Sequence, residues 1–210
     1  MKLTSSRWVN GILVGFIILT ALFFVLQFAD DYLSRKYAAE EAKQREEWGQ
    51  RANQRQSWVM AEPPDKSFSV LMPRRPTLLT NFVRSSNGTR PTIQLGATDG
   101  GRPGEAETYI AAFTEFPNNS NLTDKELIYD NAHDTLADKL GRIRREKTIT
   151  LQGISGRETE VELRTGTNLM VERVYIADNR LYQLTAVVML SRGPTTNTWH
   201  FLDSLCLNTN

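Results

Sequence analysis

Few residues of this sequence have types and a spacing that suit covalent chemistry, and His200 and Cys206 are the strongest pair. A thiolate and an imidazole act as nucleophile and base only when they lie within hydrogen-bond reach. Six positions on a helix correspond to a rotation of about 600°, which places the two side chains on different faces. We therefore predict no catalytic pair here, and we expect Cys206 to be buried beside Leu202 and Leu205.

His133 lies among aspartates that recur every four residues, Asp130, Asp134 and Asp138. A metal site needs ligands that converge, whereas carboxylates at this spacing ordinarily form the solvated face of a helix. The chain has one cysteine and two histidines, which excludes a multi-thiolate or histidine-rich centre. We predict no metal site, no cofactor and no catalytic residue.

The glycine-rich stretch 96–104 is a further candidate for a ligand loop. It lacks the Lys-Ser/Thr pair of a phosphate-binding loop and the spacing of a dinucleotide site, so we expect a mobile hairpin loop. One alternative stays open, a membrane-anchored, hydrolase-like enzyme that uses carboxylates near this loop. The sequence has no serine elbow, zinc motif or kinase signature, which favours a protein that is not an enzyme.

The charge balance argues against a nucleic-acid partner. The 210 residues include 25 Lys and Arg against 24 Asp and Glu, a net charge of +1. Domains that bind nucleic acid ordinarily carry clustered positive charge. We therefore expect other partners.

The first expected partner is the lipid bilayer, because residues 8–29 contain no charged side chain and follow a short tail, residues 1–7. A helix of this length spans about 33 Å, close to one hydrocarbon core. We expect a single transmembrane helix that acts as a signal-anchor. Its apolar and interfacial residues include Trp8, Ile12, Phe16, Leu19, Phe23, Leu26 and Tyr32. The alternatives are a cleaved signal peptide, whose apolar region is ordinarily shorter, and a buried core helix.

The orientation of this helix follows less directly from the charges. Lys2 and Arg7 precede the apolar run, but Arg35 and Lys36 follow it closely. Long domains are translocated largely regardless of charge. We expect the N-terminus in the cytoplasm and the large domain outside it. Gly11 and Gly15 also form a small-xxx-small pair, which suits helix contacts within a membrane complex.

Residues 30–58 form a charged stalk with six acidic and six basic side chains. Good helix formers dominate, so we predict a helix that continues out of the membrane. A heptad seam that starts at Leu33 and Tyr37 becomes polar, which favours a solvated spacer over a coiled coil. Trp48 and Trp58 are the exceptions, and we expect them to pack on the domain or on a partner.

Residues 59–210 have the pattern of one α+β domain. Several strands precede a helix that begins with a capping box at Thr123 and Glu126, and more strands and a short final helix follow. This order predicts a largely antiparallel β-sheet flanked by helices. We place the basic residues Arg142, Arg144 and Arg145 at the C-terminal end of the central helix, where the helix dipole favours cations. Contact with anionic lipid or an acidic partner is the alternative.

Several stretches of the domain resemble the PsbP-like α/β/α superfamily over about residues 65–208. They are the opening 68–73, the turn 153–158, the hairpin 174–184 and the closing 201–205. The resemblance implies an α/β/α sandwich that binds partners without catalysis, in bacteria usually outside the cytoplasm. The sequence thus predicts a membrane-anchored interaction module of the bacterial envelope, whose partner is another envelope or membrane protein.

Overall fold

The computed structural model describes residues 58–85, 88–99, 106–116 and 125–208. The predicted tail, the predicted span with its residues from Trp8 to Tyr32, and Trp48 lie outside these ranges. Within the ranges described, none of the helices has the length and apolar character needed to cross a bilayer.

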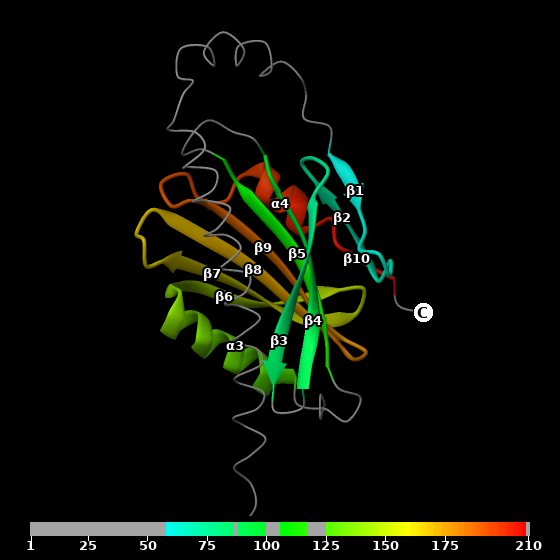
Figure 1. The fold of residues 1–210 in the computed structure, drawn as a ribbon. Helices are drawn as coiled ribbons and strands as arrows, with labels where there is room; N and C mark the ends of the chain where they lie inside the picture. Colours follow the sequence, from blue (N-terminus) through cyan, green and yellow to red (C-terminus); the bar gives the residue numbers. More distant parts are fainter. Residues whose placement is uncertain (1–57, 86–87, 100–105, 117–124, 209–210) are drawn as a thin grey trace, which may run out of the picture.

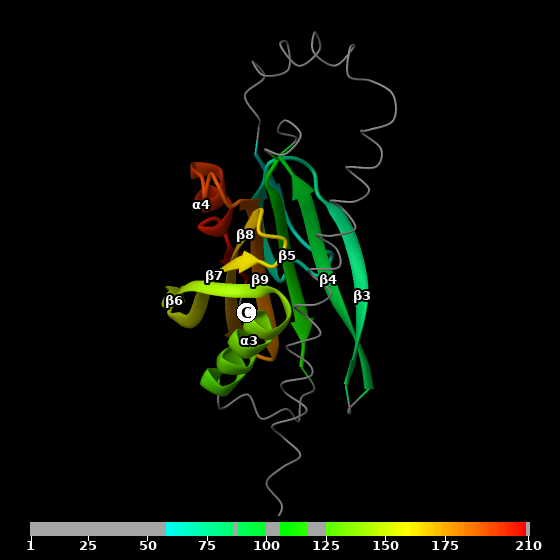
Figure 2. The ribbon, with the colours of Figure 1, turned by 90° about the vertical axis from the view of Figure 1, so that its left-hand side faces the viewer.

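A seven-stranded antiparallel sheet is the centre of the domain (Figure 1). Its strand order is β3-β4-β5-β9-β8-β7-β6, so β3 and β6 are the edges. The strands are β3 (Thr77–Ser85), β4 (Gly88–Thr98), β5 (Thr108–Glu115), β6 (Gly141–Leu151), β7 (Ile154–Leu163), β8 (Asn168–Ala177) and β9 (Arg180–Met189). Figure 2 shows β3 at the edge that lies away from both helices.

Helices α3 (Lys125–Lys139) and α4 (Thr196–Leu202) pack on opposite faces of this sheet. Alternate side chains of a strand point to opposite faces, so Met170 and Ile176 of β8 join the core with α3, whereas Val171 and Tyr175 join the core with α4. We call these two surfaces the α3 face and the α4 face. The arrangement is a largely antiparallel sheet between helices, which confirms the α+β fold expected from the sequence.

A small second sheet covers part of the α4 face. It has the order β1-β2-β10 and consists of β1 (Val59–Ala61), β2 (Phe68–Met72) and β10 (Cys206–Leu207). Phe68, Val70 and Met72 of β2 are buried, as their alternation in the sequence indicated. The described domain therefore begins and ends in the same small sheet, with β1 and β10 on either side of β2.

The hairpin between β8 and β9 turns at Asp178, which has φ 51°. Asp and Asn tolerate this left-handed conformation better than most residues, which confirms the predicted hairpin. Glycine is required for a different reason at Gly156, because a Cβ there would collide with the carbonyl of Val174 and the ring of Tyr175.

The end of α3 differs from the expectation. Ile128, Ala132 and Leu136 form a buried apolar stripe of α3, but the helix stops at Lys139 and strand β6 begins two residues later. Gly141 lies against the backbone carbonyl of Glu162, where a side chain would not fit. The residues that follow then pair with β7. The placement of Arg142, Arg144 and Arg145 at a helix end was therefore wrong.

Candidate functional site

The three predicted arginines lie on the edge strand β6, beside a row of glutamates on β7. Arg142 forms an ion pair with Glu162 at 2.8 Å, and Arg145 lies 4.0 Å from Glu160. The hydrogen bond between Arg142 and Glu162 raises the pKa of Arg142 and lowers the pKa of Glu162. Arg144 is exposed. Surface pairs of this kind contribute little to stability, and contact of the arginines with a partner stays a prediction.

The same row of glutamates continues into the core. Glu158 is only 2% exposed. Its carboxylate accepts a hydrogen bond from Nε of Arg173 at 2.7 Å and pairs with Lys147 at 2.9 Å. Arg173 also pairs with Asp203 directly after α4. This paired cluster fixes α4 on the sheet.

Trp58 packs on the domain, which is one of the two environments expected for it. Its ring makes edge-to-face contacts with Tyr109 and with His200, at centroid distances of 5.7 and 4.7 Å. Cys206 is exposed, so the prediction of a buried thiol was wrong. The helix ends at Leu202, and in the following strand β10 the alternate residue, Leu207, points inward instead.

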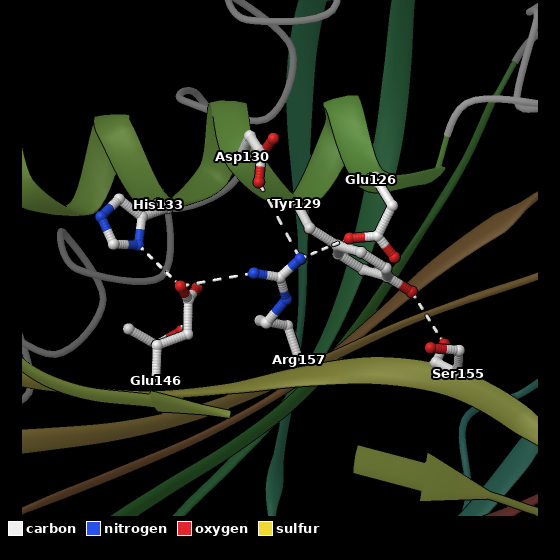
Figure 3. A network of polar contacts seen from close by, with 8 residues as sticks. Glu126, Tyr129, Asp130, His133, Glu146, Ser155 and Arg157 are labelled. Carbon is white, nitrogen blue, oxygen red and sulfur yellow. Dashed lines mark hydrogen bonds and ion pairs between the residues drawn. The ribbon is translucent and has the colours of Figure 1, made fainter. Parts of the chain in front are cut away.

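A polar network joins α3 to strands β6 and β7 (Figure 3). The guanidinium of Arg157 lies between the helix and the sheet, 2.5 Å from Glu126, 3.9 Å from Asp130 and 3.3 Å from Glu146. His133 contacts Glu146 at 3.0 Å.

The ring of Tyr129 supports the same network. It lies beneath the Arg157 guanidinium, 5.6 Å away, and its hydroxyl donates to the carbonyl of Ser155. Burial raises the pKa of Tyr129 to about 12. No group of His, Cys, Asp and Glu residues in the described ranges has the arrangement of a metal site. These ion pairs and hydrogen bonds attach the helix to the sheet.

Glu107 is the buried carboxylate next to the 96–104 stretch, at 4% exposure. It accepts hydrogen bonds from the hydroxyls of Tyr109, Thr195 and Thr198 at 2.6, 2.7 and 2.9 Å. Burial and the bond to Glu107 raise the pKa of Tyr109. Thr195 is the N-cap of α4, so this glutamate holds the start of the helix rather than facing a ligand.

The edge strand β3 presents large apolar side chains to solvent. Phe82 is 63% exposed and Leu78 is 46% exposed. With Thr80 they occupy alternate positions and therefore share the α4 face of the sheet. The place of this strand at the edge depends on the strand order, which no local sequence pattern reveals.

The same three residues also direct their backbone groups outward. Phe82 lies opposite Pro91, which has no N–H and cannot complete a hydrogen-bonded pair. The backbone N–H and C=O of Phe82 therefore point away from β4. The register continues without a bulge, so Thr80 and Leu78 are oriented in the same way. Among the described residues, no strand pairs with this outer edge.

The fold thus belongs to the class of α/β/α sandwiches with an antiparallel sheet. No protein-family model matches the chain, and no curated protein matches its sequence. Among solved structures, the cyanobacterial PsbP of Synechocystis sp. PCC 6803 is similar, with a TM-score of 0.47 and 13% identity over 72% of this chain and 93% of that one. A protein of unknown function from Pseudomonas aeruginosa is similar with a TM-score of 0.39 and 6% identity, over 64% of this chain and 84% of that one.

Proposed function

We propose that this chain is a single-pass membrane-anchored, non-catalytic binding module whose domain lies outside the cytoplasm and captures a partner protein along strand β3. The uncharged run 8–29 supports the anchor, and the charged stretch 30–58 supports a spacer between bilayer and domain. The partner is another envelope or membrane protein that supplies an extended segment.

The observation that carries the proposal is the exposed edge of β3. An edge strand with outward N–H and C=O groups is a template for the addition of another strand. Leu78 and Phe82 add apolar surface on one side of that template. A partner strand with apolar side chains at alternate positions would gain hydrogen bonds from the edge and burial from these two residues.

The alternative of an enzyme near the 96–104 stretch receives no support from the carboxylate found beside it. The two oxygens of Glu107 accept bonds from three hydroxyl groups of the protein, two of them at the start of α4. Both oxygens of Glu107 are therefore used in hydrogen bonds within the protein. Binding is therefore the function we put forward.

A pair of variants tests the proposed surface. Phe82→Lys places a charge where the partner packs, whereas Met60→Lys changes a residue on β1 with a similar exposure of 61%. We expect a partner to co-purify in stoichiometric amount, from detergent extracts of the native membrane, with the unaltered chain and with Met60→Lys, and to be lost with Phe82→Lys. Equal recovery with both variants, or a chain that purifies without a partner, would contradict the proposal. A self-associated chain in light scattering would assign the edge to a second copy instead.

A further inference from the structure

The α3 face of the large sheet contains buried polar atoms that have no partner. Five such side-chain atoms occur among the described residues, and the strand register places all five on this face. They are Gln94 Nε2, Arg157 Nε, Glu172 Oε2, Gln183 Oε1 and Thr185 Oγ1. Buried polar groups are ordinarily hydrogen-bonded, so a concentration of unpaired ones on one face needs an explanation.

Three of the five atoms are acceptor oxygens that belong to immediate neighbours. Glu172 of β8 lies directly opposite Thr185 of β9, and Gln183 is two residues along β9 on the same face. The amide of Gln183 donates to one carboxylate oxygen of Glu172, which leaves the other oxygen, Oε2, without a donor. We call these three residues the Glu172 cluster.

The cluster has a carboxylate but no cation. Glu172 is 1% exposed, and none of the ion pairs between described residues includes it. The nearest register partner on β7 is Thr159, whose hydroxyl donates to Glu146. Arg157, the basic residue on this face, is paired with Glu126, Asp130 and Glu146. A buried carboxylate without a cation is costly, and burial accordingly raises the pKa of Glu172 to about 7.

We propose that the Glu172 cluster binds the primary ammonium group of a small molecule. An ammonium group has three N–H donors and one positive charge. It would satisfy the free oxygens of Glu172, Gln183 and Thr185 together and neutralise the carboxylate. A water molecule could donate to two of these oxygens and accept from the Thr185 hydroxyl, but it would leave the charge of the carboxylate uncompensated. The inference is independent of capture along β3, which uses the opposite face and the edge of the sheet.

Calorimetric titration of the full chain in dodecyl maltoside, which has no amine, tests the proposal with ethanolamine as the probe. The titration is done in phosphate buffer at about pH 8, where the carboxyl is ionised. We expect saturable binding of ethanolamine. Ethylene glycol has no charge, and choline has the charge but no N–H donor, so neither should bind detectably at the same concentrations.

Variants of the cluster identify the residues responsible. Glu172→Gln keeps the shape but removes the charge, and we expect it to weaken ethanolamine binding at least about tenfold. Thr185→Val removes one acceptor and should weaken binding by about threefold to tenfold. Glu162→Gln, a charge change on the opposite face, is the matched control and should bind as the unaltered chain does.

Three results would overturn the inference: no binding of ethanolamine at millimolar concentrations, equal binding of choline, or unchanged affinity in Glu172→Gln. The first would mean that the cluster holds solvent only. If Glu172→Gln does not fold, the affinity of Thr185→Val decides, because that change removes a single hydroxyl. Loss of the β3 partner would leave these titrations unaffected.

Discussion

Three buried glutamates show how differently this domain accommodates one residue type. Glu158 is neutralised by Arg173 and Lys147, and Glu107 is surrounded by three hydroxyl groups. Among the described residues, Glu172 has one amide donor and no cation. A carboxyl group without compensation in a low-dielectric site favours its protonated form. Protonation of Glu172 should therefore affect stability near neutral pH.

The pH dependence of stability follows from that difference. The pKa of Glu172 rises from 4.5 to about 7 on folding, so its contribution to stability is fully present below 4.5 and is lost as the pH rises through 7. We expect Glu172→Gln, which stays neutral, to gain on the order of 2 kcal/mol relative to the unaltered chain between about pH 5 and pH 8. Urea unfolding in detergent and amine-free buffer, followed by tryptophan fluorescence, measures this difference.

Other ionisable groups lie on the α3 face, so the measured pH dependence of stability needs a control for them. The neighbours of Glu172 are uncharged, namely Thr159, Gln183 and Thr185. The polar network on α3, β6 and β7 lies beyond Thr159 and consists of Glu126, Asp130, His133, Glu146 and Arg157. Histidine ordinarily titrates in the same pH range. The comparison is therefore repeated in a His133→Gln background. A stability difference that does not change with pH in either background would contradict the assignment to Glu172.

At the scale of the elements, sequence patterns predict those features that depend on side-chain spacing and on the backbone preference of single residues. The buried stripe of α3, the alternation in β2 and the turn at Asp178 all follow from spacing and backbone preference. The strand conformation of the segment from Arg142 to Lys147 was not predicted, because its residues form helices well in isolation. Its strand conformation depends on pairing with the glutamates of β7, which no local pattern reveals.

The candidate surfaces depend on tertiary arrangement even more. The Glu172 cluster arises from the register between β8 and β9, and the role of β3 arises from the strand order. The sequence contained the signals, namely alternate Leu78, Thr80 and Phe82 and a proline in the partner strand. They have meaning only once β3 is known to be an edge.

The backbone orientation of β3 leads to a prediction about that strand. The N–H of Thr80 points away from β4, so Thr80→Pro removes a donor that the sheet does not use. We expect this variant to fold with a loss of about 1 kcal/mol or less but to lose partner capture, because the incoming strand loses a hydrogen bond and meets the proline ring. Co-purification and thermal unfolding measure the two effects.

Thr80→Val is the matched control, since it keeps the N–H and a similar shape. It should retain the partner. Capture by both variants would show that the partner does not add a strand to β3. A Thr80→Pro variant that fails to fold would contradict the orientation deduced from Pro91.

At the scale of the whole molecule, the proposal joins three parts with separate physical tasks. In this proposal the uncharged run 8–29 would supply the attachment, the charged stretch 30–58 would supply distance, and the domain would supply the recognition surface. Under this assignment of tasks, the domain itself needs no contact with the membrane. The described residues bury their apolar side chains in two cores, apart from a few on β1 and β3.

Fractionation of cells tests the attachment. We expect the chain to stay with the membrane pellet after an alkaline carbonate wash, because about 20 consecutive apolar residues suffice to span a bilayer. The double variant Val14→Arg, Ile18→Arg should move to the supernatant, since arginine at the centre of a span is costly. Protease added to intact cells should digest the domain and spare a cytoplasmic marker. An intact domain after this treatment would reverse the proposed orientation.

The pairing of β10 with β2, beside β1, has a practical consequence for measuring such a molecule. Chain entry and chain exit share one small sheet, and the lone cysteine, Cys206, is solvent-accessible there. A maleimide fluorophore could be attached to this native thiol, on the small sheet, without any engineered mutation. If the chain is anchored as proposed, energy transfer from this fluorophore to a lipid dye would measure the distance between the small sheet and the bilayer.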